Sequence, residues 1–323
     1  MAKIFCTKTI TESSFKSLEQ KGHEIVTWDD LNKGPIDRQT LISSAKDCEG
    51  LITMLSDKID EELLEQCPNL KVISQYAVGY NNIDTAATKK RGIVVTNTPD
   101  VLTHATAELA FALLISCARK IVQAAKNVEE DKWKGWEPKG FLGKSLKDTT
   151  VGIIGAGRIG SSFAKMCHGA FDSNILYYSR TKKPDLESDL DAKKADLKEL
   201  LQNSDVISLH CPLSDETKLL LDKETLSYCK KDAIIINTAR GEVINQDDLI
   251  ELLEQGHFHS IGMDVTTPEP LPHSSKLKSF ENVLIIPHIG SATETARKDM
   301  SDLVCKNIEN VLENLSPLTP ITY

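Results

Sequence analysis

The sequence predicts an α/β protein of two domains, each built on a parallel β-sheet with helices on both faces. Short apolar runs alternate with segments of helical periodicity along nearly the whole chain, which is typical of buried parallel strands. One of these runs leads into a glycine-rich turn, Gly155 to Gly160, that opens a helical pattern. The chain has 323 residues, roughly twice the 150 that serve as a single-domain prior.

Residues 1–100 contain the first alternating series. Its predicted strands are the apolar runs at 3–7, 24–28, 50–55, 71–75 and 92–96. Its helical patterns lie near 11–21, 38–47, 60–66 and 83–91. We expect residues 1–100 to form the first domain. The last helix of the chain, within residues 291–323, is expected to pack back across this domain and complete it.

A long apolar helix and an irregular arm connect the two series. The helix begins at Thr103, a capping candidate, and its apolar period continues towards residue 126. The arm, residues 132–141, carries Trp133 and Trp136 among glycines. Because an apolar helix and two tryptophans are costly to leave in water, we predict that they hold a second copy of the chain in a homodimer. The alternative is an arm packed on its own subunit.

The second series lies within residues 101–290, the expected second domain. Its strands are predicted at 150–154, 175–178, 205–209, 233–237, 261–265 and 283–286. Its helices are predicted at 158–169, 196–202, 222–229 and 246–255, followed by the last helix of the chain at 292–314. The basic doublets Lys193-Lys194 and Lys230-Lys231 are interpreted as solvated faces of helices or loops.

Composition excludes several classes of partner. The 38 basic and 47 acidic residues give a net charge of −9, so nucleic acid is not expected as a partner. The longest apolar run, residues 109–118, is too short to cross a bilayer, and the N-terminal residues lack the core of a signal peptide. The eight cysteines and eight histidines show no metal-ligand spacing. We therefore expect a cytoplasmic protein with reduced thiols and no metal site.

The turn at Gly155 has the spacing G-x-G-x-x-G between a strand and a helix. In that context Gly155 allows the tight turn, Gly157 lets backbone N–H groups approach a pyrophosphate, and Gly160 permits close packing of helix on strand. The N-terminus of the following helix adds the positive end of its dipole. The turn predicts a dinucleotide site, and the alternative is a structural βα turn.

The end of the next strand predicts which dinucleotide binds. An NAD site normally has Asp or Glu about 20 residues beyond the glycines, where it accepts hydrogen bonds from the ribose 2′-OH. Here Ser179 and Arg180 stand at that place, with Lys182 and Lys183 close behind. A carboxylate would repel a 2′-phosphate, whereas these groups would bind one, so NADP is favoured over NAD. The alternative is an exposed basic loop without a ligand.

Three ionisable residues, Arg240, Glu269 and His288, come just after the last three predicted strands of the second domain. Each alone has an ordinary structural explanation: a helix cap, a surface charge and a buried histidine. The carboxyl ends of parallel strands line one crevice, however, so the three side chains can meet. Together they provide a guanidinium to hold a carboxylate, a histidine to move a proton and a carboxylate to orient it.

Four longer motifs accompany these residues: Tyr76 to Asp84, Thr98 to Thr103, Asn245 to Leu249 and Asp264 to Pro272. With the glycine turn and the three ionisable residues, they make the chain resemble the D-isomer-specific 2-hydroxy-acid dehydrogenases over essentially its whole length. Within that family the chain is most similar to the glyoxylate/hydroxypyruvate reductase branch. The resemblance implies a flavodoxin-like substrate domain and a Rossmann dinucleotide-binding domain.

The resemblance also implies a role for each substrate-site residue. Backbone N–H groups of Val78 and Gly79 would bind the substrate carboxylate, and Arg240 would reach both the carboxylate and the 2-oxo oxygen. His288 would protonate that oxygen, and Glu269 would keep the imidazole oriented and protonated. The substrate-binding residues implied are Leu55, Val78, Gly79, Arg240 and His288.

The implied cofactor site is larger. Asp264 would face the nicotinamide carboxamide, with the Thr238 backbone nearby and Pro212 on the adenine side. The residues implied to contact the cofactor are Thr106, Gly155, Gly157, Arg158, Ile159, Gly160, Ser179, Arg180, Thr181, Lys182, Pro212, Thr238, Asp264 and Gly290.

The expected reaction is the NADPH-dependent reduction of glyoxylate and hydroxypyruvate to glycolate and D-glycerate. One alternative is an NAD-linked enzyme that acts on another D-2-hydroxy acid or on 3-phosphoglycerate. A second alternative is a corepressor-like protein that senses dinucleotides and binds peptides. Consumption of NADPH in the presence of glyoxylate distinguishes an enzyme from such a binding protein.

Overall fold

The computed structural model describes residues 1–28 and 34–322. The chain divides into two compact units, one of residues Met1–Leu102 with Ser291–Tyr323 and one of residues Thr103–Gly290. Each unit is built on one parallel sheet with helices against it, so the predicted two-domain α/β class is confirmed.

The first unit contains a five-stranded sheet in the order β2-β1-β3-β4-β5. Its strands are β1 Lys3–Cys6, β2 Glu24–Thr27, β3 Gly50–Thr53, β4 Val72–Gln75 and β5 Val94–Thr96. Its helices are η1 Glu12–Phe15, α1 Lys16–Gln20, α2 Arg38–Ala45, α3 Glu61–Gln66, α4 Thr85–Lys90 and α12 Glu294–Leu312. Asp37, Asp60 and Asp84 fix the starts of α2, α3 and α4, because each carboxylate accepts the N–H of the third helical residue.

Helix α12 belongs to the first unit although it ends the chain. The Tyr76 hydroxyl donates to the Arg297 carbonyl at 2.7 Å, which ties the end of β4 to α12. Asn307 is buried, and its Oδ1 accepts the N–H groups of Leu318 and Thr319 at 2.8 and 3.1 Å. The C-terminal tail is thereby fixed beside the helix, and Thr96 forms a bridge with Pro320.

The second unit contains a seven-stranded parallel sheet in the order β12-β11-β10-β9-β6-β7-β8. Its strands are β6 Thr150–Ile154, β7 Asn174–Tyr178, β8 Lys193–Lys194, β9 Val206–Leu209, β10 Ile234–Asn237, β11 Ser260–Met263 and β12 Val283–Ile285. Its helices are α5 Thr103–Arg119, α6 Ile121–Glu129, α7 Arg158–Phe171, α8 Pro184–Leu190, α9 Leu197–Asn203, α10 Lys223–Ser227 and α11 Gln246–Glu254, with short turns η2 Gly241–Val243 and η3 Lys276–Ser279. The strand order reverses between β6 and β9, which is where open sheets of this kind bind ligands.

Apolar side chains from both faces of this sheet form its two cores. Residues of α5 and α7 pack on one face, and residues of α9, α10 and α11 pack on the other. The central strands β9, β10 and β11 are buried along their whole length, which explains why their sequences are nearly continuous apolar runs.

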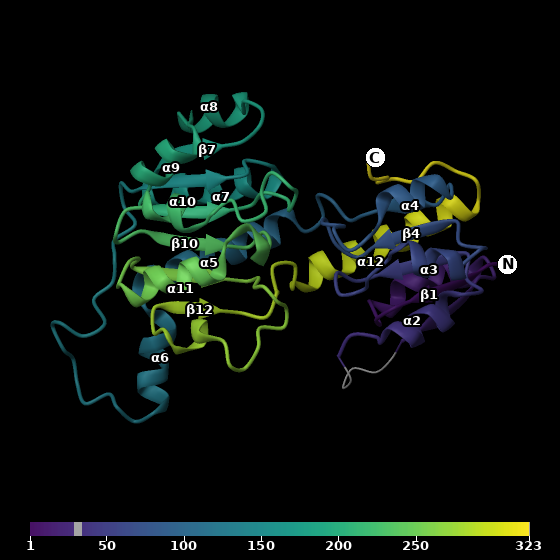
Figure 1. Ribbon diagram of the computed structural model, residues 1–323, viewed down its shortest axis with the longest axis horizontal. Helices are drawn as coiled ribbons and strands as arrows, with labels where there is room; N and C mark the ends of the chain where they lie inside the picture. Colours follow the sequence, from purple (N-terminus) through teal and green to yellow (C-terminus); the bar gives the residue numbers. More distant parts are fainter. Residues whose placement is uncertain (29–33, 323) are drawn as a thin grey trace. The chain divides into compact units, whose positions relative to one another are not determined.

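The long helix predicted from residue 103 towards residue 126 is wrong as a single element. Lys120 adopts a left-handed conformation with φ of 53°, so α5 ends at Arg119 and α6 begins at Ile121. A left-handed residue cannot continue a right-handed helix, and the apolar period carries no sign of this break. Helix α6 and the following loop extend away from the sheet of their unit (Figure 1).

Two other local predictions also need correction. The Lys193-Lys194 doublet forms the edge strand β8, which pairs with Leu176 and Tyr177 of β7; both lysines are solvated, but not on a helix or loop. A two-residue strand with two exposed lysines has no apolar pattern, so only its pairing defines it. The first helix, predicted at 11–21, begins as the 3₁₀ turn η1 before the short helix α1.

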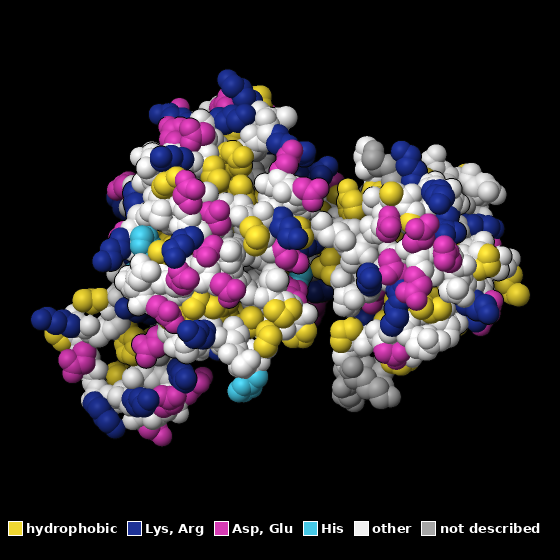
Figure 2. All heavy atoms as spheres, in the orientation of Figure 1, with side chains coloured by type: hydrophobic (Ala, Val, Ile, Leu, Met, Phe, Trp, Pro, Cys, Tyr) yellow, Lys and Arg dark blue, Asp and Glu magenta, His cyan; other side chains and the backbone are white. Residues whose placement is uncertain are grey.

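Surface charge, helix hydrophobicity and the state of the cysteines are features of both units. Basic and acidic side chains are interspersed over the face seen in Figure 2. No helix in the described residues is long and apolar enough to span a membrane. The eight cysteines, all in described positions, are free and buried, and burial raises the pKa of each thiol.

Candidate active site

The glycine turn lies between β6 and α7, at the point where the strand order reverses. Gly155 has φ of +94°, and a Cβ there would overlap the backbone of Cys211 after β9. A Cβ at Gly160 would overlap the Gly155 carbonyl, so α7 packs closely on the turn. At Gly157, in contrast, an added Cβ would meet nothing within 4 Å. The turn is therefore tight on its protein side and open at Gly157.

These features fit a dinucleotide pyrophosphate. The open side of Gly157 leads into the N-terminus of α7, whose 14 residues give a helix dipole with its positive end at Arg158. First-turn N–H groups of a helix have no partner within the helix and favour an anion. Ile159 belongs to that turn, so the predicted phosphate-binding residues lie together.

Other predicted cofactor residues follow the neighbouring strands. Pro212 lies after β9, Thr238 after β10 and Asp264 after β11. A Cβ added at Gly290 would lie 3.0 Å from Asp264 Oδ2 and 3.3 Å from Thr106 Cγ2. The fold thus brings Thr106 of α5, Asp264 and Gly290 together at the carboxyl ends of the strands.

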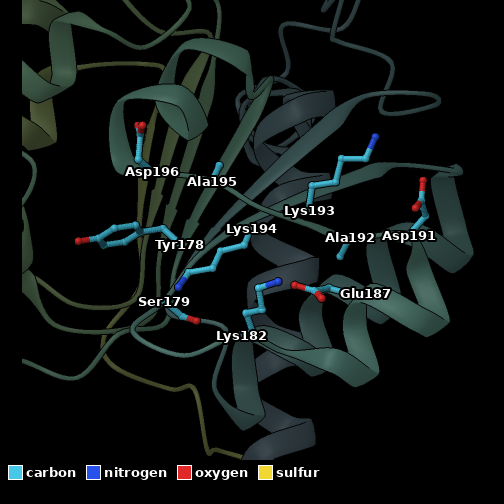
Figure 3. A pocket seen from close by; sticks show the side chains of 10 residues that line it. All are labelled: Tyr178, Ser179, Lys182, Glu187, Asp191, Ala192, Lys193, Lys194, Ala195 and Asp196. Atoms are coloured by element: carbon cyan, nitrogen blue, oxygen red, sulfur yellow. The ribbon is translucent and has the colours of Figure 1, made fainter.

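A hollow of about 690 Å³ lies at the end of β7, where the ribose 2′ position is expected. Ser179 and Lys182 line it, and so does Lys194 of β8, whose side chain extends toward Ser179 (Figure 3). The Lys194 ammonium donates to the Arg180 carbonyl at 3.3 Å, and the Ser179 hydroxyl donates to the Thr181 carbonyl at 2.5 Å. Three carboxylates also line the hollow: Glu187, Asp191 and Asp196. The sequence did not identify Lys194, because its edge strand has no recognisable pattern.

Glu269 and His288 are joined by a hydrogen bond of 2.9 Å between Glu269 Oε2 and His288 Nδ1. The other carboxylate oxygen of Glu269 accepts the Thr266 N–H at 3.0 Å, which holds the carboxylate on its own loop. Burial favours the neutral acid, but the hydrogen bond with His288, the charges of His288 and Arg240 and the Thr266 N–H outweigh it. The pKa of Glu269 therefore lies below its usual value. The carboxylate is ionised beside the imidazole.

Arg240 is half-buried and lies within electrostatic range of Glu269. Its Nη1 donates to the Ala239 carbonyl at 2.6 Å. The turn that carries it is shaped by Asn237, whose amide donates to the Arg240 carbonyl at 2.9 Å and accepts the Ala239 N–H at 3.0 Å. Burial lowers the pKa of Arg240 from its usual value, against the opposing charges of Glu269 and Glu242. The guanidinium remains charged near neutral pH because its usual pKa is above 12.

His288 is held by its backbone as well as by Glu269. Its φ of 52° is left-handed, and its N–H donates to the Asp264 carbonyl at 3.0 Å. The Asp264 carboxylate accepts the next two N–H groups, from Ile289 at 2.6 Å and Gly290 at 2.9 Å. Burial raises the pKa of Asp264, although these N–H groups and His288 oppose the shift. Its contact with the nicotinamide carboxamide stays a prediction; the structure shows that it fixes the turn of His288.

A second histidine, His210 after β9, was overlooked in the sequence. Its Nε2 lies 2.8 Å from Ser208 Oγ and its Nδ1 lies 3.3 Å from Thr238 Oγ1. Burial lowers the pKa of His210 to about 3, so this ring is neutral. Its ring is tilted against that of Phe163, with an interplanar angle of 47° and ring centroids 5.2 Å apart. The residues around His210 are mostly those of an apolar strand, so the sequence does not indicate that its ring contacts Ser208 and Thr238.

The predicted carboxylate-binding turn belongs to the first unit and follows β4. Among the described residues, the N–H groups of Val78 and Gly79 donate to no protein acceptor, as a carboxylate-binding turn requires. Asn97 Nδ2 donates to the Val78 carbonyl at 2.8 Å, which fixes the turn from the protein side.

The loop of Leu55 after β3 is tied to the same region of the first unit. Asn82 Nδ2 donates to the carbonyls of Met54 and Asp57 at 3.0 and 2.8 Å, and Asn82 Oδ1 accepts from Gln75 Nε2 at 2.9 Å. The half-buried amide of Asn82 therefore fixes the Leu55 loop relative to the end of β4. In the sequence, Asn82 is part of the Tyr76 to Asp84 motif, and no local pattern indicates these partners.

A parallel sheet with a glycine turn at its switch point, and an Arg, a Glu and a His at its carboxyl edge, define a nicotinamide-dinucleotide oxidoreductase. The family model described as D-isomer specific 2-hydroxyacid dehydrogenase, NAD binding domain, matches residues 111–290. The chain belongs to this family.

Relatives and solved structures agree with this membership. The chain is 47% identical to the glyoxylate reductase of Thermococcus litoralis, over 95% of this chain and 92% of the relative. It is 45% identical to the glyoxylate reductase of Pyrococcus horikoshii, over 95% and 91%. A crystal structure of a Thermus thermophilus protein superposes with a TM-score of 0.93 at 39% identity, covering 99% of this chain and 100% of the other. An NADPH-dependent glyoxylate/hydroxypyruvate reductase of Sinorhizobium meliloti, in complex with NADP and malonate, has a TM-score of 0.85 at 29% identity, covering 99% and 97%.

Proposed function

We propose that this protein reduces glyoxylate and hydroxypyruvate with NADPH, giving glycolate and D-glycerate. The observation that carries the proposal is the Glu269–His288 pair, 2.9 Å apart and within electrostatic range of Arg240, which is suited to protonate an oxygen next to a carboxylate. The similarity to glyoxylate reductases over 95% of the chain supports the substrate class.

Each residue of the site has one task in this reaction. Val78 and Gly79 donate their N–H groups to the substrate carboxylate, and Arg240 binds the carboxylate and the 2-oxo oxygen. When bound, the nicotinamide dinucleotide supplies the hydride that reduces the 2-oxo carbon. His288 gives its proton to the oxygen as negative charge develops there, and Glu269 keeps the imidazole in the orientation and charge state that this requires.

The proposed preference for NADPH depends on the end of β7. Ser179 stands where an NAD site has a carboxylate, and Arg180 and Lys182 add positive charge beside it. The glycine turn and the first turn of α7 would hold the pyrophosphate, as the open side of Gly157 allows. The cytoplasm is the proposed location, and the eight buried free thiols support a reducing compartment.

An initial-rate panel tests the reaction. NADPH and NADH are each measured with glyoxylate, hydroxypyruvate, pyruvate and phenylpyruvate. The highest kcat/KM values are expected for NADPH with glyoxylate and with hydroxypyruvate. A preference for NADH would favour the NAD-linked alternative. No turnover with any pair would favour a dinucleotide-sensing binding protein.

Replacing Arg180 with Ala tests the cofactor preference. Each charge-assisted hydrogen bond to the 2′-phosphate contributes on the order of 1.5–3 kcal/mol, less where solvent screens it. The KM for NADPH is therefore expected to rise by roughly ten- to a hundredfold, while the KM for NADH changes little. Adding Ser179→Asp is expected to invert the preference, because a carboxylate repels the phosphate and binds a free 2′-OH.

The matched control for Arg180→Ala is Arg119→Ala, at the end of α5 and outside this hollow. Its NADPH to NADH ratio of kcat/KM is expected to equal that of the wild type. A wild-type ratio that favours NADH, or a ratio that Arg180→Ala leaves unchanged, would contradict the assignment of the 2′-phosphate site.

We further propose that the protein is a homodimer held by α6 and the arm. None of the residues of α6 is buried, and Trp133 and Trp136 are 68% and 84% exposed. So large an apolar surface is costly in water unless a partner covers it. Sedimentation at micromolar concentration is expected to give twice the chain mass of 35.7 kDa. The double variant Trp133→Ser, Trp136→Ser is expected to shift towards monomer; a monomeric wild type would refute the dimer.

A further inference from the structure

We propose that Gln246 is a positioning residue for the reaction: its side-chain amide holds the loop that carries Glu269 against the segment that carries Arg240. Gln246 is the first residue of α11, six positions after Arg240. Gln246 can have this task only if His288 and Glu269 act as proposed above, and the experiment below separates the two questions.

The contact is a two-point hydrogen bond to one residue. Thr267 donates its N–H to Gln246 Oε1 at 2.9 Å, and Gln246 Nε2 donates to the Thr267 carbonyl. A primary amide is the side-chain group that offers one acceptor and two donors in a single plane. The backbone of Thr267 is therefore fixed in position and in orientation.

The fixed residue lies two positions before Glu269. On the next residue back, the Thr266 N–H donates to Glu269 Oε1 at 3.0 Å, and Thr266 Oγ1 donates to the Pro268 carbonyl at 2.8 Å. The second oxygen of Glu269 then bonds His288 at 2.9 Å. An unbroken path of covalent and hydrogen bonds leads from the amide of Gln246 to the imidazole.

The loop of Glu269 has few other backbone donors with which to fix itself. Pro268 and Pro270 flank Glu269, and proline has no N–H to donate. The Thr267 N–H that Gln246 binds is therefore one of the few backbone groups through which the body of the second unit can hold this loop.

The same two segments also meet at a second place. A Cβ added at Gly241, the residue after Arg240, would overlap the carbonyl group of Thr266. The backbones of the Arg240 segment and the Glu269 loop thus touch at Gly241 and are tied at Gln246. Van der Waals contact at Gly241 limits how closely they approach, and the amide prevents them from separating. Arg240 and Glu269 are in this way set relative to each other.

The charged groups that act on Arg240, Asp264 and Glu269 lie near this junction, and Asp247 and Asp248 follow Gln246 in the first turn of α11. Glu269 faces His288 and Arg240, Asp264 faces both His288 and Glu269, and Glu242 faces Arg240. Gln246 is neutral, so replacing it by another neutral residue changes the geometry of this group and leaves its charges in place. Any change in the pH dependence of the rate then reports the distance between Glu269 and His288.

The test uses the full chain with Gln246→Met, which preserves length and removes both hydrogen bonds. Losing two such bonds is expected to lower kcat for glyoxylate reduction by about tenfold, with the dissociation constant for NADPH unchanged. The pH–rate profile is expected to shift in the same direction as that of Glu269→Gln, measured alongside, because both changes weaken the contact between Glu269 Oε2 and His288 Nδ1. The control is Gln255→Met, the same change at the exposed C-terminal end of α11, which is expected to behave as wild type.

Each result has a defined meaning. If Gln246→Met equals Gln255→Met in kcat, or lowers kcat without moving the pH profile, Gln246 has no positioning role. If Gln246→Met does not fold, Gln246→Asn, whose amide is one methylene shorter, is expected to show the same direction of change, and its failure to do so counts equally against the proposal. If His288→Ala retains its kcat, the proposed proton donor is wrong whatever Gln246 does.

Discussion

Replacing His288 with Ala is expected to lower kcat for glyoxylate reduction by about 10²–10⁴-fold, the usual contribution of a positioned proton donor. The imidazole is 2.9 Å from an ionised carboxylate and is carried by a backbone turn that Asp264 fixes. His210, a second histidine at the carboxyl ends of the strands, is not expected to replace it, because the pKa of His210 is lowered to about 3 and its ring is neutral.

The measurement is steady-state kcat at saturating NADPH and glyoxylate, together with the dissociation constant for NADPH. That constant is expected to change little, because the residues proposed to hold the pyrophosphate and the 2′-phosphate lie at the glycine turn and after β7. His288→Asn is the companion variant, because asparagine tolerates the left-handed backbone with φ of 52° better than alanine does. A kcat near that of the wild type in both variants would show that the proton comes from water or another group.

Replacing Arg240 with Met is expected to lower kcat/KM for glyoxylate by roughly 10²–10⁴-fold. A guanidinium that binds a carboxylate in two places contributes about 1.5–3 kcal/mol per charge-assisted bond, and each 1.4 kcal/mol is about tenfold in rate. Arg240→Lys is expected to recover little, since an ammonium cannot form two parallel bonds to a planar carboxylate. Arg180→Ala, the loss of an exposed arginine, serves as the control and is expected to leave KM for glyoxylate unchanged at saturating NADH.

Arg240→Met and Arg240→Lys both need a test of folding, because Arg240 is half-buried and its charge acts on Glu269. Thermal unfolding and NADPH binding provide it. A folded Arg240→Met protein that binds NADPH and keeps kcat/KM within threefold of wild type would remove Arg240 from the substrate site.

The sequence predicted the sheet architecture because buried parallel strands leave a direct mark. The runs at 150–154 and 233–237 are almost wholly apolar, and the structure places them as β6 and β10. Short edge and connecting elements leave no such mark. Strand β8 is two solvated lysines, and the left-handed Lys120 interrupts an apolar period that continues unchanged across it.

The residues of the candidate site also fall into two groups, those that the sequence indicates and those that only the structure shows. Arg240, Glu269 and His288 were found because each follows a recognisable strand and has an ionisable side chain. Gln246, Lys194 and His210 were missed because their importance comes from partners distant in sequence: Thr267, the end of β7, and the pair Ser208 and Thr238. Hydrogen bonds across such separations depend on strand order and register, which no local pattern contains.

The buried cysteines allow the unfolding of this protein to be measured by their chemical reactivity. Thiolates are the reactive form of cysteine, so thiols that are buried and have raised pKa values react slowly with alkylating reagents while the chain is folded. Cys6, Cys48, Cys67 and Cys305 belong to the first unit, and Cys117, Cys167, Cys211 and Cys229 belong to the second. Timed alkylation followed by peptide mass spectrometry therefore measures the unfolding of each unit separately, with four natural probes in each and no engineered label.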